Sequence, residues 1–344
     1  MNSTLSVSER LEAFQKLGKK LATLSEQQIQ EWCYKSQAKN AWFDEFHVRY
    51  AIEKIACMLQ EKELEMWVRY YQIPERCDSK KVGVIMAGNI PAVGFHDFIC
   101  VLMSGHQILA KLSSIDDFLL KAIAQELIFI QPKFERQIVW AEMLKEADAF
   151  IATGSDNSAR YFEYYFRNKP HIIRKNRVSV AVLHGDETDA TLELLTKDIL
   201  LYYGLGCRNV AKIFVPQHFS IEKFLAIATP WSKECHQHYK YANNYDYNKS
   251  IYLVNQIPHL DNGSLIALET TELVSPISVV YYQKYQKIEE VFNQLAEFNH
   301  KIQCIASENG WFPNSIPIGQ TQSPTLFDYP DNIDVMQFCL TLPS

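Results

Sequence analysis

The stretch VGVIMAGNIPAVGFHDFICVLMSGHQILAKLSS (residues 82–114) decides the fold class. It predicts an apolar strand over 82–87, a helix over 93–103 and a second strand over 108–112. A strand–helix–strand unit of this length connects parallel strands. Because both strands are apolar along nearly their whole length, we expect a sheet that helices cover on both faces.

The same alternation continues along the chain, so we predict an α/β protein. Helices are expected over 116–130, 157–166 and 190–203, and strands over 137–140, 149–152, 178–183 and 210–215. Residues 1–75 are predicted to be helical, with serine caps at Ser6 and Ser25, and 75–80 is a polar connector. The tyrosine-rich segment His238–Ser250 is predicted to be a loop.

Length and charge exclude several classes of protein. The 344 residues suggest two domains at about 150 residues each. A net charge of −6 argues against nucleic-acid binding, which needs a basic surface. The charged first twenty residues do not resemble an export signal, and the uncharged stretch Val82–His96 is shorter than the ~20 residues of a membrane span. We therefore expect a cytoplasmic protein without a membrane span.

The eight cysteines form no C-x-x-C pair, so the sequence predicts no zinc ribbon and no other metal site. The nearest approach to a metal cluster is Cys235, His236 and His238, which we interpret as part of a surface helix or loop. We expect reduced thiols that are mostly buried.

Polar and small residues follow the predicted parallel strands, where ligands bind in open α/β sheets. They are Gly88 and Asn89 after the first strand, Lys111, Ser113 and Ser114 after the second, Thr153, Gly154 and Ser155 after a later one, and His184 and Glu187 after the strand at 178. A G-x-G-x-x-G fingerprint does not follow the first strand, so the usual dinucleotide loop is not predicted.

In the segment Tyr203–Asn209 (YGLGCRN), Gly204 and Gly206 precede Cys207, and a predicted strand follows it. A thiol in such a turn is a candidate nucleophile whose reactivity depends on its thiolate fraction. A buried cysteine in a tight turn is the alternative interpretation, and the local sequence favours neither.

Four motifs in order give the chain a family resemblance. They are GNIP (88–91), AKLSS (110–114), ATGSDN (152–157) and GLGCRN (204–209), and HIIRKNRVSVAVLHGDE (171–187), ELVSP (272–276) and GQTQSPTLFDYPDNIDVMQF (319–338) extend them. The chain resembles the acyl-CoA reductase family, which includes the fatty acid reductase subunit of bacterial luminescence and is a branch of the aldehyde dehydrogenase superfamily.

The resemblance implies an aldehyde dehydrogenase-like fold with a Rossmann-type cofactor-binding domain and an α/β catalytic domain. We expect an N-terminal helical region (1–80) that packs on the cofactor domain. That domain spans 81–183, and residues 318–344 return to it. The catalytic domain spans 184–317 and carries the thiol.

The resemblance also implies roles for single residues. Cys207 matches the thiol that attacks an acyl thioester, and Asn89 matches the amide that helps to hold the oxyanion together with the Cys207 N–H. A lost donor of this kind typically costs about 10²–10³-fold in rate. For cofactor binding, Lys111 matches the lysine that hydrogen-bonds the cofactor ribose, and Ser113 and Ser114 lie beside it in sequence. Thr153, Gly154 and Ser155 match the loop that contacts the dinucleotide. Glu272 belongs to an E-x-x-x-P segment whose glutamate binds the nicotinamide ribose.

Two departures from the superfamily pattern refine the expectation. Ser114 stands where NAD-preferring members often hold a glutamate, so we expect NADPH as the cofactor. The E-L-G-G-K segment of the oxidising enzymes is missing, and residues 182–187 roughly take its place. This fits a reductase, and it leaves open whether His184 or Glu187 moves a proton.

The predicted function is NADPH-dependent reduction of an acyl-CoA, or of an acyl–protein thioester, to the aldehyde through a cysteine thioester. One alternative is a reductase of an acyl phosphate or acyl adenylate. Another is a non-reducing acyl carrier or scaffold subunit that works with an acyl-activating partner protein. A homodimer is the expectation from base rates. The sequence does not predict the length of the acyl group.

Overall fold

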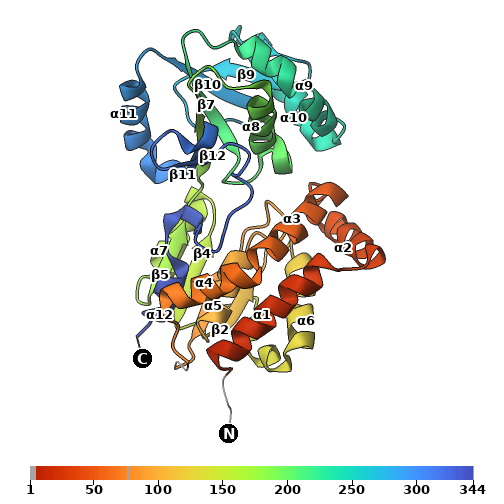
Figure 1. The fold of residues 1–344 in the computed structure, drawn as a ribbon, viewed down its shortest axis with the longest axis vertical. Helices are drawn as coiled ribbons and strands as arrows, with labels where there is room; N and C mark the ends of the chain where they lie inside the picture. The colour runs from red at the N-terminus through yellow and green to blue at the C-terminus, as the bar shows by residue number, and fades with distance from the viewer. Residues whose placement is uncertain (1–4, 76–77, 344) are drawn as a thin grey trace. The chain divides into compact units, whose positions relative to one another are not determined.

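The computed structural model describes residues 5–75 and 78–343. The chain divides into two compact units (Figure 1). Unit 1 comprises residues up to Asn176 together with Pro324 onward, and unit 2 comprises Arg177–Ser323. In the part of the chain that is described, no helix is long and apolar enough to span a bilayer.

Unit 1 begins with the helices α1 (Val7–Ala22), α2 (Glu26–Lys39), α3 (Glu45–Met58) and α4 (Glu61–Tyr71). A capping box starts α1, since Ser6 Oγ accepts the Glu9 N–H and a Glu9 carboxylate oxygen accepts the Ser6 N–H at 2.8 Å. Ser25 Oγ caps α2 by accepting the Gln28 N–H. Both caps and the helical character of the described part of the predicted block are confirmed, and residues 1–4 lie outside the described residues. Residues 76–77 of the predicted connector lie outside the described residues.

The sheet of unit 1 has the order β3-β2-β1-β4-β5 among the described residues, and its neighbouring strands run parallel. Its strands are β1 (Lys81–Ile85), β2 (Gln107–Lys111), β3 (Ile138–Trp140), β4 (Ala149–Thr153) and β5 (His171–Arg174). The remaining helices of unit 1 are α5 (Phe95–Met103), α6 (Leu119–Ile130), α7 (Asp156–Phe166) and α12 (Val335–Leu340). Strand β5 was not predicted, because His171 and Arg174 interrupt its apolar run.

Helices cover both faces of this sheet. On one face, Val82 and Val84 of β1 share a core with buried residues of α1, α3, α5 and α6. On the other face, Phe150 of β4 packs against Phe162 and Phe166 of α7. The apolar strands therefore do indicate a doubly covered parallel sheet, and the N-terminal helices belong to the same core as β1.

Unit 2 holds a second sheet of order β12-β11-β6-β7-β10-β9-β8 in its described residues, and only β8 runs antiparallel to its neighbour there. Its strands are β6 (Val178–Val182), β7 (Val210–Pro216), β8 (Leu260–Asp261), β9 (Ile266–Glu269), β10 (Val279–Tyr285), β11 (Ile302–Ser307) and β12 (Ser315–Pro317). The helices are α8 (Asp189–Leu200), α9 (Ile221–His236), α10 (Tyr239–Val254) and α11 (Ile288–Phe298). In Figure 1, α11 and α8 lie on opposite sides of these strands.

Strand pairing assigns β6 to unit 2. The sequence pattern placed 178–183 in the cofactor domain, whereas β6 pairs with β7 and β11 in the second sheet. The hydrophobic pattern identifies a strand but not the strands that pair with it, so the sequence does not show which sheet contains it. Of the segment 318–344 predicted to return to the cofactor domain, residues 324–343, with α12, lie in unit 1, whereas residues 318–323 lie in unit 2.

The loop predicted over His238–Ser250 is wrong, because α10 occupies it. Tyr241, Tyr245, Asn248 and Tyr252 form a buried stripe at helical spacing. Their polar atoms are satisfied. Tyr241 donates to the Ser264 C=O at 3.0 Å, and Asn248 Nδ2 donates to the Ile277 C=O at 2.9 Å. A helix face of hydrogen-bonded tyrosines has the composition of a polar loop, and this produced the error.

Candidate active site

In unit 1, the candidate cofactor residues meet at the carboxyl edge of the sheet. Ile85 of β1 pairs with Lys111 of β2 on one side and with Ala152 of β4 on the other. Neighbouring strands are about 4.8 Å apart, so the segments that follow β1, β2 and β4 lie next to one another. This edge therefore carries Asn89, Lys111, Ser113, Ser114, Thr153, Gly154 and Ser155.

The loop after β1, which contains Asn89, is held from two sides. The Asp116 carboxylate accepts the N–H of Ala92 at 2.9 Å, where the backbone is left-handed with φ 52°. From the N-terminal helices, Asn40 Nδ2 donates to the Gly88 C=O at 3.3 Å. Burial raises the pKa of Asp116 to about 7. Sequence analysis missed Asp116 and Asn40, because the spacing of neither residue relates it to this loop.

Gly88 permits close packing between this loop and the end of β2. A Cβ built on Gly88 would lie 2.6 Å from the Ser113 Cβ, far inside van der Waals contact. The absence of a side chain at Gly88 therefore lets the segment that contains Ser113 pack directly on the Asn89 loop.

The third part of this edge is the Thr153–Ser155 loop. Ser155 caps α7 by accepting the Ser158 N–H at 3.3 Å, which leaves the first N–H groups of the helix at the sheet edge. The Gly154 N–H donates to the Arg174 C=O at 3.2 Å. The Arg174 side chain makes a buried two-point ion pair with Asp97 of α5, at 2.7 and 2.8 Å. This pair fastens β5 to the helix that follows the Asn89 loop.

In unit 2, Cys207 lies in the turn between α8 and β7. Its side chain is partly accessible, as is Cys304 in β11. Of the other described cysteines, Cys57 is exposed, and Cys33, Cys100, Cys235 and Cys339 are buried. Cys207 is therefore not fully buried, and its role as the nucleophile stays a prediction.

The Asn209 side chain fixes the turn. Its Oδ1 accepts the Gly206 N–H at 2.8 Å, and its Nδ2 donates to three carbonyl groups near the end of α8, those of Asp198, Ile199 and Leu201. Upstream, Tyr202 and Tyr203 have left-handed backbones with φ 52° and 58°. Such residues cost about 1–3 kcal/mol each and persist where the surroundings hold them. The sequence motif contains Asn209 but does not reveal its role.

Ser179 links the turn to β6 and β11. Its hydroxyl donates to the Cys207 C=O at 3.0 Å and lies 3.0 Å from the Cys304 sulfur. Sequence analysis missed Ser179 and Cys304, because β6 and β11 are far apart in sequence and only sheet pairing brings them together.

His184 and Glu187 lie at the opposite end of β6 from Ser179. Four residues separate Ser179 from Leu183, which corresponds to about 13 Å along a strand. The Glu187 carboxylate accepts the N–H groups of His184 and Gly185 at 2.7 and 2.9 Å, and His184 Nε2 lies 2.8 Å from a Glu308 oxygen. These two residues are therefore part of a strand-end turn.

Glu272 is exposed and lies beside a buried lysine. Lys212 of β7, five residues after Cys207, donates to the Thr271 C=O at 2.9 Å and to Gln283 Oε1 at 2.7 Å. Burial lowers the pKa of Lys212 to about 8, although the nearby Glu272 carboxylate opposes the shift. Lys212 thus holds the segment that presents Glu272, and the sequence contains no signal for that role.

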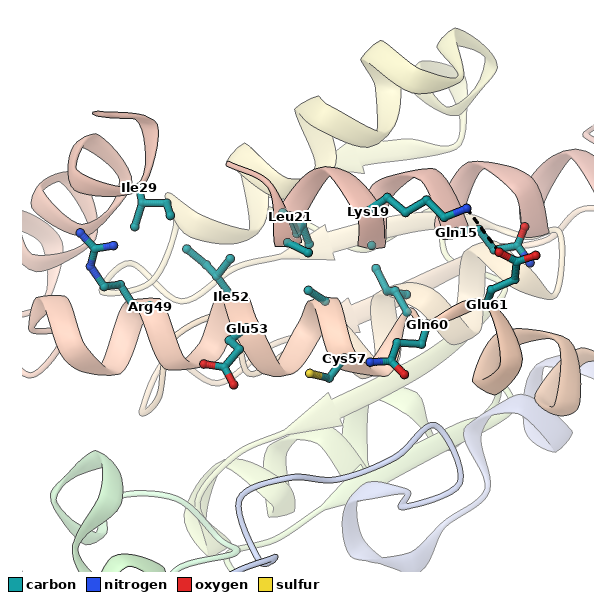
Figure 2. Close-up of a pocket in the computed structure, with 14 residues that line it drawn as sticks. Gln15, Lys19, Leu21, Ile29, Arg49, Ile52, Glu53, Cys57, Gln60 and Glu61 are labelled. Carbon is teal, nitrogen blue, oxygen red and sulfur yellow. Dashed lines mark hydrogen bonds and ion pairs between the residues drawn. The ribbon is translucent and has the colours of Figure 1, made fainter. Parts of the chain in front are cut away.

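A groove of about 570 Å³ lies elsewhere in unit 1, between α1 and α3. Figure 2 shows Leu21 and Ile52 between the two helices, and the dashed line marks the Lys19–Glu61 ion pair at its rim. Among its described lining residues are none of the candidate site residues. The groove is therefore separate from the sheet edge described above.

Comparison with known proteins identifies both a family and a fold. Residues 69–226 match the family model described as acyl-CoA reductase (LuxC). In the comparison with curated proteins, none matches this protein.

The protein is also similar to solved aldehyde dehydrogenase structures. An aldehyde dehydrogenase from Mycobacterium tuberculosis, complexed with NAD⁺, is 14% identical with a TM-score of 0.63 over 92% of this chain and 76% of that one. A succinic semialdehyde dehydrogenase from Streptococcus pyogenes, in complex with NADP⁺, is 13% identical with a TM-score of 0.64 over 88% and 76%. Aldehyde dehydrogenase 21 from Physcomitrella patens, in complex with succinate, is 12% identical with a TM-score of 0.63 over 89% and 74%.

At these identities the solved structures establish the fold alone. The expected aldehyde dehydrogenase-like fold is confirmed. The protein thus has an aldehyde dehydrogenase-like fold, and its residues 69–226 are similar to the acyl-CoA reductase (LuxC) family.

Proposed function

We propose that this protein reduces an acyl-CoA, or an acyl–protein thioester, to the aldehyde with NADPH, through a thioester on Cys207. The observation that carries the proposal is the partly accessible Cys207 thiol, held in a strained turn by four hydrogen bonds from the Asn209 side chain. Such strain is typical of functional sites. The family match over 69–226 includes this turn.

In the first half-reaction, the Cys207 sulfur, after loss of its proton, attacks the acyl carbonyl. The carbon–sulfur bond to coenzyme A then breaks, and the coenzyme A thiolate takes up a proton. We propose that the Cys207 N–H and the Asn89 side-chain amide donate to the oxyanion. In the second half-reaction, Cys207 leaves as a thiolate when the reduced carbon becomes an aldehyde.

NADPH, when bound, supplies the hydride. We propose that unit 1 holds the cofactor with Lys111, Ser113, Ser114, Thr153, Gly154 and Ser155, and that Glu272 of unit 2 holds its nicotinamide ribose. The groups at the sheet edge fit a dinucleotide, because an ammonium, serine and threonine hydroxyls and the N-terminus of α7 donate to phosphates and ribose hydroxyls.

The choice of NADPH over NADH rests on Ser114. A glutamate at this position would repel a 2′-phosphate, whereas a hydroxyl donates to it. Purified enzyme should show a higher kcat/KM with NADPH, and Ser114→Glu should reverse the order. A higher kcat/KM with NADH in the unmodified enzyme would contradict this part of the proposal.

The decisive experiment is intact-mass measurement after incubation with a panel of acyl-CoAs and no NADPH. We expect one acyl group per protein molecule, located on Cys207 after digestion. Cys207→Ala should abolish the adduct and leave NADPH binding unchanged. Cys304→Ala, which removes the other partly accessible thiol in unit 2, should still be acylated. An undiminished reductase rate in Cys207→Ala would refute the mechanism.

The same assay separates the remaining candidates. Acylation by an acyl phosphate or acyl adenylate, but not by acyl-CoA, would identify another activated donor. Single-turnover acylation without NADPH oxidation would identify a non-reducing acyl carrier.

A further inference from the structure

Asp198 is a buried acid that the proposed mechanism leaves unused. It lies in the last turn of α8, and 1% of its surface is exposed. Its Oδ2 accepts the Gly319 N–H at 2.6 Å, and its Oδ1 accepts both the N–H and the hydroxyl of Thr321, at 3.3 and 2.7 Å. All three partners are donors. A carboxylate satisfies them, whereas an amide would turn its own NH₂ group toward a donor.

Thr321 is held from its other side by the residue that follows the nucleophile. Arg208 Nε donates to the Thr321 C=O at 2.5 Å, and Thr321 is fully buried. Thr321 is therefore fixed between the Asp198 carboxylate and the Arg208 guanidinium. Gly319 and Thr321 belong to the GQTQ motif, to which the sequence analysis assigned no role.

A second connection joins Asp198 to the same turn. Its backbone carbonyl oxygen accepts Asn209 Nδ2 at 3.1 Å, and Asn209 Oδ1 in turn accepts the Gly206 N–H at 2.8 Å. The residues before and after Cys207 are thus both hydrogen-bonded into a network that contains Asp198. A buried network of this kind fixes one arrangement only when every member is satisfied.

We infer that Asp198 is a positioning residue for Cys207, and that it acts through Thr321 and Arg208. The inference rests on the proposed role of Cys207 as the nucleophile. Loss of the carboxylate would release Gly319 and Thr321, and Arg208 would then lose a fixed acceptor. A misplacement of the sulfur by about 1 Å can cost about 10²-fold in rate.

The test compares Asp198→Asn, Thr321→Val and Thr321→Ser in the full-length protein. Valine removes the hydroxyl that donates to Asp198, while serine keeps it. We expect acylation by acyl-CoA without NADPH to be at least tenfold slower in Asp198→Asn and Thr321→Val. Thr321→Ser should stay within about twofold of the unmodified enzyme. The dissociation constant for NADPH should not change.

A second readout separates positioning from general loosening of the fold. A mobile turn should expose its thiol, so the alkylation of Cys207 by iodoacetamide should become faster in the same two variants in which acylation becomes slower. Peptide mass spectrometry reads each cysteine separately. Buried Cys235 of unit 2 should stay unlabelled in every variant. Labelling of Cys235 together with Cys207 would indicate global destabilisation and overturn the inference.

Unchanged acylation and unchanged Cys207 alkylation in Asp198→Asn and Thr321→Val would also overturn it. If Asp198→Asn does not fold, the matched pair at Thr321 decides alone, because serine keeps the hydroxyl that donates to Asp198 and valine removes it. The alkylation assay needs no acyl donor, so it tests the positioning role even if the proposed function fails. Failure of the proposed function would be seen separately, because acyl-CoA would not acylate the wild-type enzyme.

Discussion

The two units use parallel sheets in opposite ways. Unit 1 presents polar residues on the segments that follow β1, β2 and β4, whereas unit 2 holds Cys207 in the turn before β7. Segments after parallel strands offer N–H groups, hydroxyls and a helix N-terminus, which suit a phosphate-bearing ligand. The nucleophile proposed at Cys207 needs one fixed sulfur position, and left-handed residues and the Asn209 side chain hold the turn that contains it.

Buried charged groups are held in two ways in this protein. Unit 1 neutralises Arg174 with Asp97 in a two-point ion pair. In unit 2, Asp198 and Lys212 hydrogen-bond to uncharged groups of the segments around Thr321 and Thr271. Burial therefore moves the pKa of each toward neutrality, to about 6 for Asp198 and about 8 for Lys212. Asp116 of unit 1 is of this second kind, because it accepts the Ala92 N–H and burial raises its pKa to about 7.

The largest effect is expected from Asp97→Ala. Removal of one partner leaves the Arg174 guanidinium buried and unpaired, which typically costs about 3–5 kcal/mol. Hydrogen–deuterium exchange should show lost protection in β5 and α5, with unit 2 unchanged. As a control, Glu163→Gln breaks the exposed pair with Lys175 and should cost less than about 1 kcal/mol. Equal loss of protection in both units would contradict their independence.

Asn89→Ala should lower kcat/KM for acyl-CoA by about 10²–10³-fold, because it removes a proposed oxyanion donor. The melting temperature should change little. Asn40→Ala is the matched control, since it removes the bond to the Gly88 C=O in the same loop but no proposed contact with substrate. A loss in Asn40→Ala as large as that in Asn89→Ala would show that loop order, and not the amide, accounts for the effect.

Lys212→Met tests the charge arrangement of unit 2 through pH. The folded-state pKa of Lys212, about 8, lies below its usual value of 10.5, so the unfolded protein binds this proton more tightly. The free energy of unfolding contributed by Lys212 should therefore rise between pH 8 and 10.5, by up to about 3 kcal/mol. Urea unfolding at several pH values should show this rise relative to Lys212→Met. Parallel pH profiles of the two proteins would refute it.

Gly88→Ala and Gly204→Ala separate packing from backbone conformation. At Gly88 the new Cβ would lie 2.6 Å from Ser113, so overpacking should cost about 1–3 kcal/mol. At Gly204 the nearest atom is 3.5 Å away and φ is +78°, so only left-handed strain of about 1–2 kcal/mol is expected. Thermal unfolding measures both. A larger loss at Gly204 would show that strain outweighs packing.

Sequence patterns predicted the strand–helix alternation of unit 1 well, because β1, β2 and β4 are apolar along most of their length. They failed at α10, whose buried face is made of hydrogen-bonded tyrosines, and at β5, whose run is interrupted by charge. They could single out Cys207 and the residues after β1, β2 and β4 as candidates, because turn chemistry and strand ends are local. They missed Asn40, Asp116, Ser179, Lys212 and Asp198, because each acts on a segment that is distant in sequence or unrelated by spacing.

The sequence by itself determined the α/β class, the helical N-terminus, the doubly covered sheet and the thiol in its glycine-flanked turn, since each follows from local periodicity and backbone preference. Tertiary structure alone decided which sheet takes β6, that His184 and Glu187 lie at the far end of that strand from Ser179, and that Asp198, Thr321 and Arg208 form one network. Strand pairing and the burial of charged groups depend on residues that are far apart in sequence, so no local sequence pattern predicts them.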